Sequence, residues 1–265
     1  MRRFLPIGIL VVWALAALVG PSLPLAPNQI DLPSIIQGPT LLQPLGTDDL
    51  GRSVLDRLVV GSRTSFLVAI GVVALSIALG VFVGGVAGYV GGWIDLATVR
   101  LIDVFLAFPG ILLAIALAAV LGPGLGNLII ALAAVGWVGY ARLTRAQVMS
   151  LRGRDHVLAA RALAVPAHRI LIRHLLPLAA APLIVEATFG IASVVVAEAG
   201  LSFLGLGIQP PGASWGSMIR DGVAYMLVSP HLVLAPGLAL LLVVLAVNLA
   251  GDHLRDLLDV RASRT

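Results

Sequence analysis

Long runs of apolar residues, separated by short polar segments, dominate the chain. Each run is close to or longer than the roughly 20 residues that an α-helix needs to cross about 30 Å of hydrocarbon. The runs are continuous rather than alternating, which disfavours β-strands. The pattern therefore predicts an all-α integral membrane protein with six transmembrane helices. They are expected at about residues 4–20, 64–90, 101–121, 127–149, 177–204 and 231–250.

The composition agrees with this class. The chain is 59% hydrophobic and 11% charged, whereas about a quarter of the residues of a soluble domain are charged. The net charge of +4 does not indicate nucleic acid, because the basic residues cluster in segments between apolar runs, as membrane orientation requires. All basic residues in that charge are arginines, so the chain lacks the lysine of an ATP-binding P-loop. Any ATP and Mg²⁺ that drive its function must bind to another chain.

No cysteine is present, which excludes disulfides and thiolate metal ligands. The histidines show no metal-ligand spacing, so we expect neither a metal site nor a cofactor on this chain. The bilayer itself is an expected partner, and nucleic acid is not.

The arginines also predict an orientation. Thirteen lie on the side that holds both termini and residues 150–176, and four lie on the other side. The positive-inside rule places the richer side, including both termini, in the cytoplasm. Residues 1–60 are then an N-terminal anchor with an external segment, 61–252 the transmembrane domain and 253–265 a cytoplasmic tail. The first run resembles a secretory signal, but prolines at 21, 24 and 27 favour an uncleaved anchor.

Residues 142–177 form a basic, amphipathic island between two spans, and seven arginines lie within it. Asp155 can cap a short helix, and Leu158, Ala159, Ala162 and Leu163 then recur at helical spacing. Pro166 ends or bends that helix. A short helix of small residues flanked by arginines suits insertion into a groove on a cytoplasmic partner. A surface helix held by anionic lipid is the alternative.

This loop resembles that of the permease subunits of bacterial ABC importers, in which Glu-Ala-Ala, three residues, Gly, nine residues and Ile-x-Leu-Pro follow one another. Ala159-Ala160 and Leu176-Pro177 match at the correct spacing. Leu158 replaces the glutamate, Ala164 the glycine and His174 the isoleucine. In that family the loop forms a coupling helix seated in a cleft of the ATPase, which here assigns the docking role to Asp155, Leu158, Ala159, Ala160, Arg161, Leu163, Ala164 and Pro166.

Further segments resemble the second permease of the dipeptide, oligopeptide and nickel group. They are 45–52, 91–95, 201–207, 209–216 and 248–256, in the family's order. The resemblance implies a type I ABC importer permease fold in the bacterial inner membrane. It also implies a homologous second permease, two ATPases and an external solute-binding protein as partners. Peptides are the first expectation for the substrate, and nickel or a metal chelate is the rival.

Three polar side chains within the spans are candidates for the translocation path, namely Glu186, Glu198 and Asn248. A charge at membrane depth is costly unless it faces a cavity or a partner. Glu186, nearer mid-span, suits the path best and could meet a peptide's amino group, although a hydrogen-bonded role at a helix contact is an equal alternative. Glu198 could instead organise the turn at 205–207, and Asn248 could bond across helices.

Gly80, Gly84, Gly88 and Gly92 recur every fourth residue and should share one helix face. Such a face permits close helix packing, either within the chain or against another subunit.

A remote alternative function is a membrane-embedded serine hydrolase. Residues 212–216 fit the pattern G-x-S-x-G around Ser214, and His231 follows. A nucleophile elbow requires a strand before the serine, whereas Gln209-Pro210-Pro211 precedes this one.

Overall fold

The computed structural model describes residues 4–258, and all of its regular elements are helices apart from an isolated antiparallel bridge between Thr47 and Ser53. The α-helices are α1 (Phe4–Val19), α2 (Val54–Val90), α3 (Gly92–Leu106), α4 (Gly110–Leu121), α5 (Leu125–Leu151), α6 (Asp155–Ala162), α7 (Ala167–Ile170), α8 (Leu176–Phe203), α9 (Trp215–Val223) and α10 (His231–Leu258). Short helical turns are η1 (Gly20–Ser22) and η2 (Leu32–Ser34), and a π-helical turn, η3 (Leu171–Leu175), joins α7 to α8.

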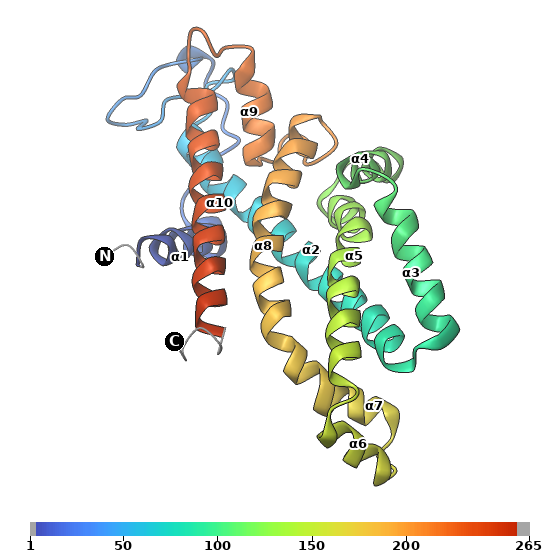
Figure 1. The fold of residues 1–265 in the computed structure, drawn as a ribbon. Coiled ribbons are helices and arrows are strands. Elements are labelled where there is room, and N and C mark those ends of the chain that lie inside the picture. The colour runs from blue at the N-terminus through green and yellow to red at the C-terminus, as the bar shows by residue number, and fades with distance from the viewer. Residues whose placement is uncertain (1–3, 259–265) are drawn as a thin grey trace.

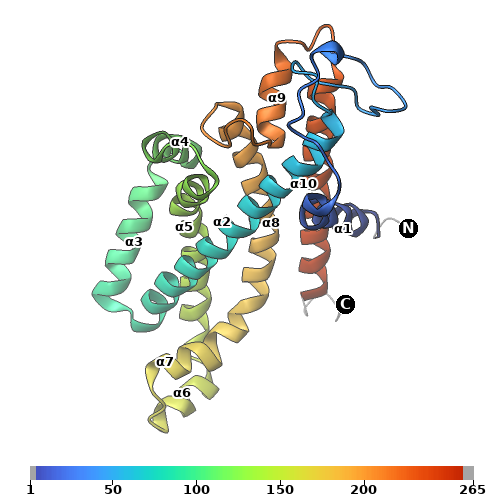
Figure 2. The same ribbon diagram turned by 180° about the vertical axis from the view of Figure 1, so that it is seen from behind.

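The long helices form an elongated bundle with two distinct ends (Figures 1 and 2). Helices α6 and α7 lie at one end, which we call the coupling end. Residues 20–53 and 204–230, including α9, lie at the opposite end, which we call the loop end. Helix α1 runs crosswise and packs against α2 and α10. The fold therefore separates the predicted cytoplasmic loop from the predicted external segments by the length of the bundle.

Five helices are long and apolar enough to span a membrane, and α3 with α4 adds a sixth if the pair counts as one span. The prediction of one continuous helix over 101–121 was wrong, because α3 and α4 meet at an angle of 84°. Pro109 lies at the break and is the N-cap of α4. The proline disfavours helical backbone at the residue before it, so the chain turns there.

Two boundaries also differ from the sequence prediction. Helix α2 begins at Val54, inside the segment expected to be external, and α10 continues to Leu258, into the expected tail. Ser53 caps α2 by accepting a hydrogen bond from the Asp56 backbone N–H at 3.3 Å. Polar residues in the first turns of α2 interrupt the apolar run, so hydropathy alone places the start of this helix too late. Residues 259–265 of the expected tail lie outside the described range.

Glycines let α2 approach α5 closely. A Cβ added at Gly84 would lie 2.1 Å from the Ala141 carbonyl oxygen, and one at Gly88 would lie 2.7 Å from that of Arg145. Gly80 faces the same helix at Tyr140. These three glycines therefore serve packing within the chain. Gly92 does not, because α2 ends at Val90 and a Cβ at Gly92 would have no atom within 4 Å.

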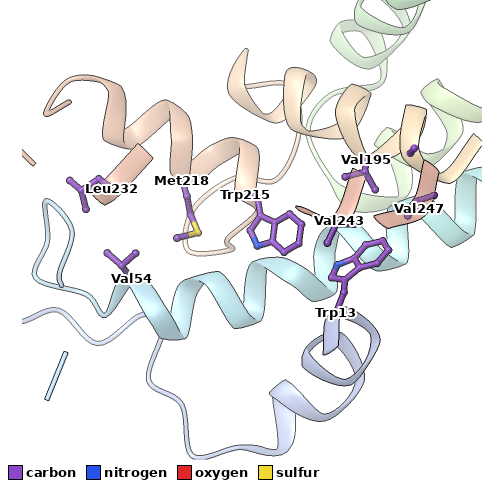
Figure 3. Packing of buried hydrophobic residues seen from close by; sticks show 10 residues of the cluster. Trp13, Val54, Val195, Trp215, Met218, Leu232, Val243 and Val247 are labelled. Carbon is purple, nitrogen blue, oxygen red and sulfur yellow. The ribbon is translucent and has the colours of Figure 1, made fainter. Parts of the chain in front are cut away.

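A hydrophobic cluster at the loop-end half of the bundle joins α1, α2, α8, α9 and α10 (Figure 3). Trp13 of α1 lies edge-on to Phe66 with ring centroids 5.2 Å apart, and Trp215 of α9 is beside it. The Trp215 indole N–H donates to the Leu58 carbonyl at 3.0 Å. Burial of these large rings fixes the crosswise helix and α9 on the long helices.

An acid–base cluster orders the loop end. The Arg52 guanidinium contacts the Asp48 carboxylate at 2.7 Å, and Arg57 of α2 reaches the same carboxylate at 3.4 Å. Both arginine side chains are buried, so the pairs are shielded from water. Residues 46–53 are thereby held against the start of α2.

Candidate functional site

The predicted coupling helix is present as α6, and its N-terminus differs from the expected one. Arg154 occupies the N-cap position without a side-chain hydrogen bond, and Asp155 is the first residue of the helix rather than its cap. A carboxylate in the first turn still stabilises the positive end of the helix dipole.

The C-terminus of α6 forms a Schellman motif. The Val165 N–H donates to the Ala160 carbonyl at 3.0 Å, and the Ala164 N–H donates to that of Arg161 at 2.9 Å. This motif requires a left-handed residue after the helix, and Ala164 supplies it with φ of 55°. Ala164 stands where the importer pattern has glycine. The left-handed backbone at this position favours glycine, whereas here the residue carries a Cβ.

Helix α6 has a buried and an exposed face. Ala160 and Val157 are buried in a cluster with residues from α5, α7 and η3, whereas Leu158 and Leu163 are 49% and 80% exposed. Ala160 therefore belongs to the inner face, where its side chain packs against neighbouring helices, and its docking role stays a prediction. Leu158, Ala159, Arg161, Leu163, Ala164 and Pro166 form the exposed surface, which we call the docking face.

Two arginines brace this region against the end of α2. The Arg161 guanidinium lies over the Tyr89 ring, 5.0 Å from its centroid. Arg152 donates to the Gly88 carbonyl at 3.1 Å. The docking face is consequently attached to α2 as well as to the helices that flank it in sequence.

Glu186 is exposed and lines a cavity of about 450 Å³ between α5, α8 and α10. A Cβ added at Gly139 of α5 would lie 3.7 Å from its Oε1 atom. Leu143, Pro182, Phe189 and Arg255 also line the cavity. Of the three path candidates, Glu186 alone combines a carboxylate with an accessible cavity.

Glu198 is instead fully buried within the chain. Its carboxylate accepts hydrogen bonds from Ser65 of α2 and Ser202 of α8, each at 2.8 Å. The Ser202 carbonyl in turn accepts from the Gly205 N–H at 3.1 Å. The side chain connects α2 and α8 below the turn at 205–207, in agreement with the alternative role given to Glu198, and in the described chain it is not exposed to a path.

Asn248 makes no hydrogen bond to another helix within the described range. Its amide donates to the Val244 carbonyl of the same helix at 2.9 Å. The predicted bond across helices is therefore not seen in the described residues, and a path role for Asn248 stays a prediction.

Ser214 is the N-cap of α9 and is buried. Its hydroxyl accepts from the Ser217 N–H at 3.2 Å, and Ser217 reciprocates in a capping box. No strand precedes it in residues 4–258, and His231 lies against Gly46 instead. The surroundings of a nucleophile elbow are thus missing from the described chain, and the hydrolase alternative lacks support.

Two charged residues escaped the sequence analysis as site residues. Arg145 of α5 makes a bidentate pair with Asp95 of α3, one bond of which measures 2.7 Å. Arg255 shares the cavity with Glu186. Each partner is 50 or more positions away in sequence, so no local spacing could have connected them.

Comparison with known proteins assigns this architecture to a family. Residues 76–264 match the family described as "Binding-protein-dependent transport system inner membrane component". The fold is similar to a chain in a structure titled "Inward facing conformations of the MetNI methionine ABC transporter", with a TM-score of 0.57 and 19% identity over 76% of this chain and 96% of that one.

Curated relatives agree with the family match. The dipeptide transport system permease protein DppC of Alkalihalophilus pseudofirmus is 44% identical over 84% of this chain and 74% of its own length. The nickel transport system permease protein NikC of Escherichia coli is 42% identical over 94% and 92%. The glutathione transport system permease protein GsiD of Escherichia coli is 42% identical over 88% and 77%.

Proposed function

Because the chain belongs to the family of binding-protein-dependent transport system inner membrane components, we propose that it imports di- and oligopeptides by alternating access. It is an ABC importer permease of the peptide, nickel and glutathione group. In the proposed assembly it pairs with a homologous permease, two ATPases and a solute-binding protein. The bundle lies in the inner membrane with both termini in the cytoplasm.

The docking face is the observation that carries the energy-coupling part of the proposal. Leu163 is 80% exposed beyond the helices that are apolar enough to span a membrane. An apolar side chain so exposed, beside Leu158 and several arginines, has the character of an interface anchor. An ATPase that grips this face can transmit its closure to α5 and α8.

Substitution of Leu163 tests the docking face. Leu163→Asp removes the anchor and adds a carboxylate to the interface, whereas Leu163→Met keeps its apolar volume. In the reconstituted importer we expect Leu163→Asp to lower ATP-driven uptake about tenfold or more while the two permeases still assemble, and Leu163→Met to retain uptake. Normal uptake by Leu163→Asp would contradict the docking assignment.

Peptide import is favoured by the relative DppC, and nickel is a second candidate because NikC matches over more of both chains. The direct test offers radiolabelled alanyl-alanine and Ni²⁺ separately to the reconstituted importer with ATP. Peptide uptake is the expected result. Uptake of Ni²⁺ without peptide uptake would replace the proposed substrate with nickel.

A further inference from the structure

A carboxylate and a guanidinium face one cavity toward the coupling end. Glu186 of α8 and Arg255 of α10 both line this cavity, and both residues are exposed in the chain. Among residues 4–258, the ion pairs are confined to other arginines and aspartates. The two opposite charges are therefore left without an ionic partner in the described chain.

The two residues lie at similar depth along the bundle. Helices α8 and α10 run in opposite directions (Figure 1), and a Cβ added at Gly251 would lie 2.6 Å from Thr188 Oγ1. Arg255 is one turn beyond Gly251, and one turn back from Thr188 along α8 is Ile184. Arg255 is thus level with a point within about one turn of Glu186.

The cavity provides a reason to keep these charges. A carboxylate facing lipid within a span costs several kcal/mol, whereas one facing an aqueous path does not. Pro182 also lines the cavity and has no N–H, so the Leu178 carbonyl lacks its usual helical donor. The carboxylate of Glu186 and the guanidinium of Arg255 therefore line the cavity, and the Leu178 carbonyl lies one turn from Pro182 beside it.

We propose that Glu186 and Arg255 form a transient site for the two charged ends of a free peptide. Glu186 receives the peptide's ammonium group and Arg255 its carboxylate. This inference rests on the proposed function and narrows its substrate to peptides with unblocked termini. A hydrated divalent cation meets attraction from Glu186 but repulsion from Arg255, so the site disfavours the rival cargo.

Binding to the importer in lipid nanodiscs tests the site without a solute-binding protein. Saturation-transfer NMR compares alanyl-alanine with N-acetyl-alanyl-alanine and with alanyl-alaninamide. In the wild type we expect the doubly charged peptide to bind about fivefold to tenfold more tightly than either blocked form, since each blocked end loses one charge-assisted contact.

The variants give a crossed pattern that a merely structural role would not produce. Glu186→Gln should remove the discrimination against the acetylated peptide and keep that against the amide. Arg255→Gln should do the reverse. Asp103→Asn and Arg100→Gln are charge-removing controls at exposed positions of α3 that do not line the cavity, and they should behave like the wild type.

Equal binding of all three peptides to the wild type, or unchanged discrimination in both cavity variants, would overturn the site. Uptake of alanyl-alanine is measured in parallel. If that uptake is intact while discrimination is missing, this inference fails and the proposed function stands. If the wild type takes up no peptide, the proposed function fails first.

Discussion

Ala164 holds an unfavourable backbone conformation at a critical residue of the coupling loop. Its φ of 55° is left-handed, a conformation that costs a residue with a Cβ about 1–2 kcal/mol and costs glycine nothing. The two hydrogen bonds of the Schellman motif hold the residue there. The end of α6 therefore retains its shape against a local penalty.

Replacement of Ala164 by glycine should stabilise this end of the helix. We expect a gain of about 1 kcal/mol, after allowance for the greater freedom of glycine in the open state. Hydrogen exchange at the last amides of α6, in the nanodisc-embedded importer, should slow about fivefold. Ala164→Val, with a branched side chain at the same φ, should accelerate exchange, and equal rates in all three proteins would refute the strain.

For individual residues, the sequence predicted which side chains are candidates for a function. It did not predict the direction in which each side chain points. The importer resemblance assigned both Leu163 and Ala160 to docking, and helical spacing could not separate them, since alanine is compatible with either face of a helix. Glu186 and Glu198 are both carboxylates in one apolar run. Only the packing of α2 distinguishes them, because Ser65 that binds Glu198 lies 133 residues away.

Among the elements, the pair α2 and α5 depends on absent side chains. Gly80, Gly84 and Gly88 place the two backbones in contact over two turns. In a membrane, lipid tails contact apolar helix faces as favourably as another helix does. Close approach at small residues therefore stabilises a helix pair through the van der Waals contacts that it adds. The pair therefore forms the centre of the bundle.

Gly84→Ala should separate these helices. The new methyl group would overlap the Ala141 carbonyl, and overpacking of this kind costs about 1–3 kcal/mol. We expect a lower melting temperature for the purified permease pair. Gly126→Ala is the matched control in α5, where a Cβ meets no atom within 4 Å, and it should melt at or above the wild-type temperature. Equal melting of both variants would contradict the packing.

The elements show where apolar patterning succeeds and fails as a predictor. Five of the predicted apolar runs are continuous helices near their expected positions, and each is long and apolar enough to span a membrane. The third run kept its hydropathy but not its straightness, since Pro109 redirects the backbone within an apolar segment. Gly92 continues the recurrence of glycine at every fourth residue, but it lies beyond the end of α2.

For the whole molecule, the positions of the two ends predict a sidedness. The loop end carries Leu41, which is fully exposed, and the coupling end carries Leu163. Arginine distribution assigns the first to the outside and the second to the cytoplasm. The chain contains no cysteine, so a single introduced thiol reports one position without background.

A membrane-impermeant maleimide should modify Leu41→Cys in intact cells. It should leave Leu163→Cys unmodified until the cells are opened and the proteins denatured. Denaturation removes protection by a bound ATPase, so the second step shows that the thiol can react. Labelling of Leu163→Cys from outside an intact cell would invert the topology and remove the docking face from the reach of any ATPase.

The helical run Ala167–Phe203, which includes the π-turn η3, connects the coupling end to the loop-end half of the bundle as one continuous element. Its 37 residues extend for about 55 Å. If this run tilts by a few degrees about its end beside α6, its other end at Phe203 moves by several ångströms. This displacement is comparable to the diameter of a passage that a small solute requires. Since each residue turns a helix by about 100°, loss of the extra residue in η3 would rotate Glu186 away from its cavity. The π-turn thus sets the rotation of Glu186 relative to α6, the helix on which the ATPase acts in the proposed assembly.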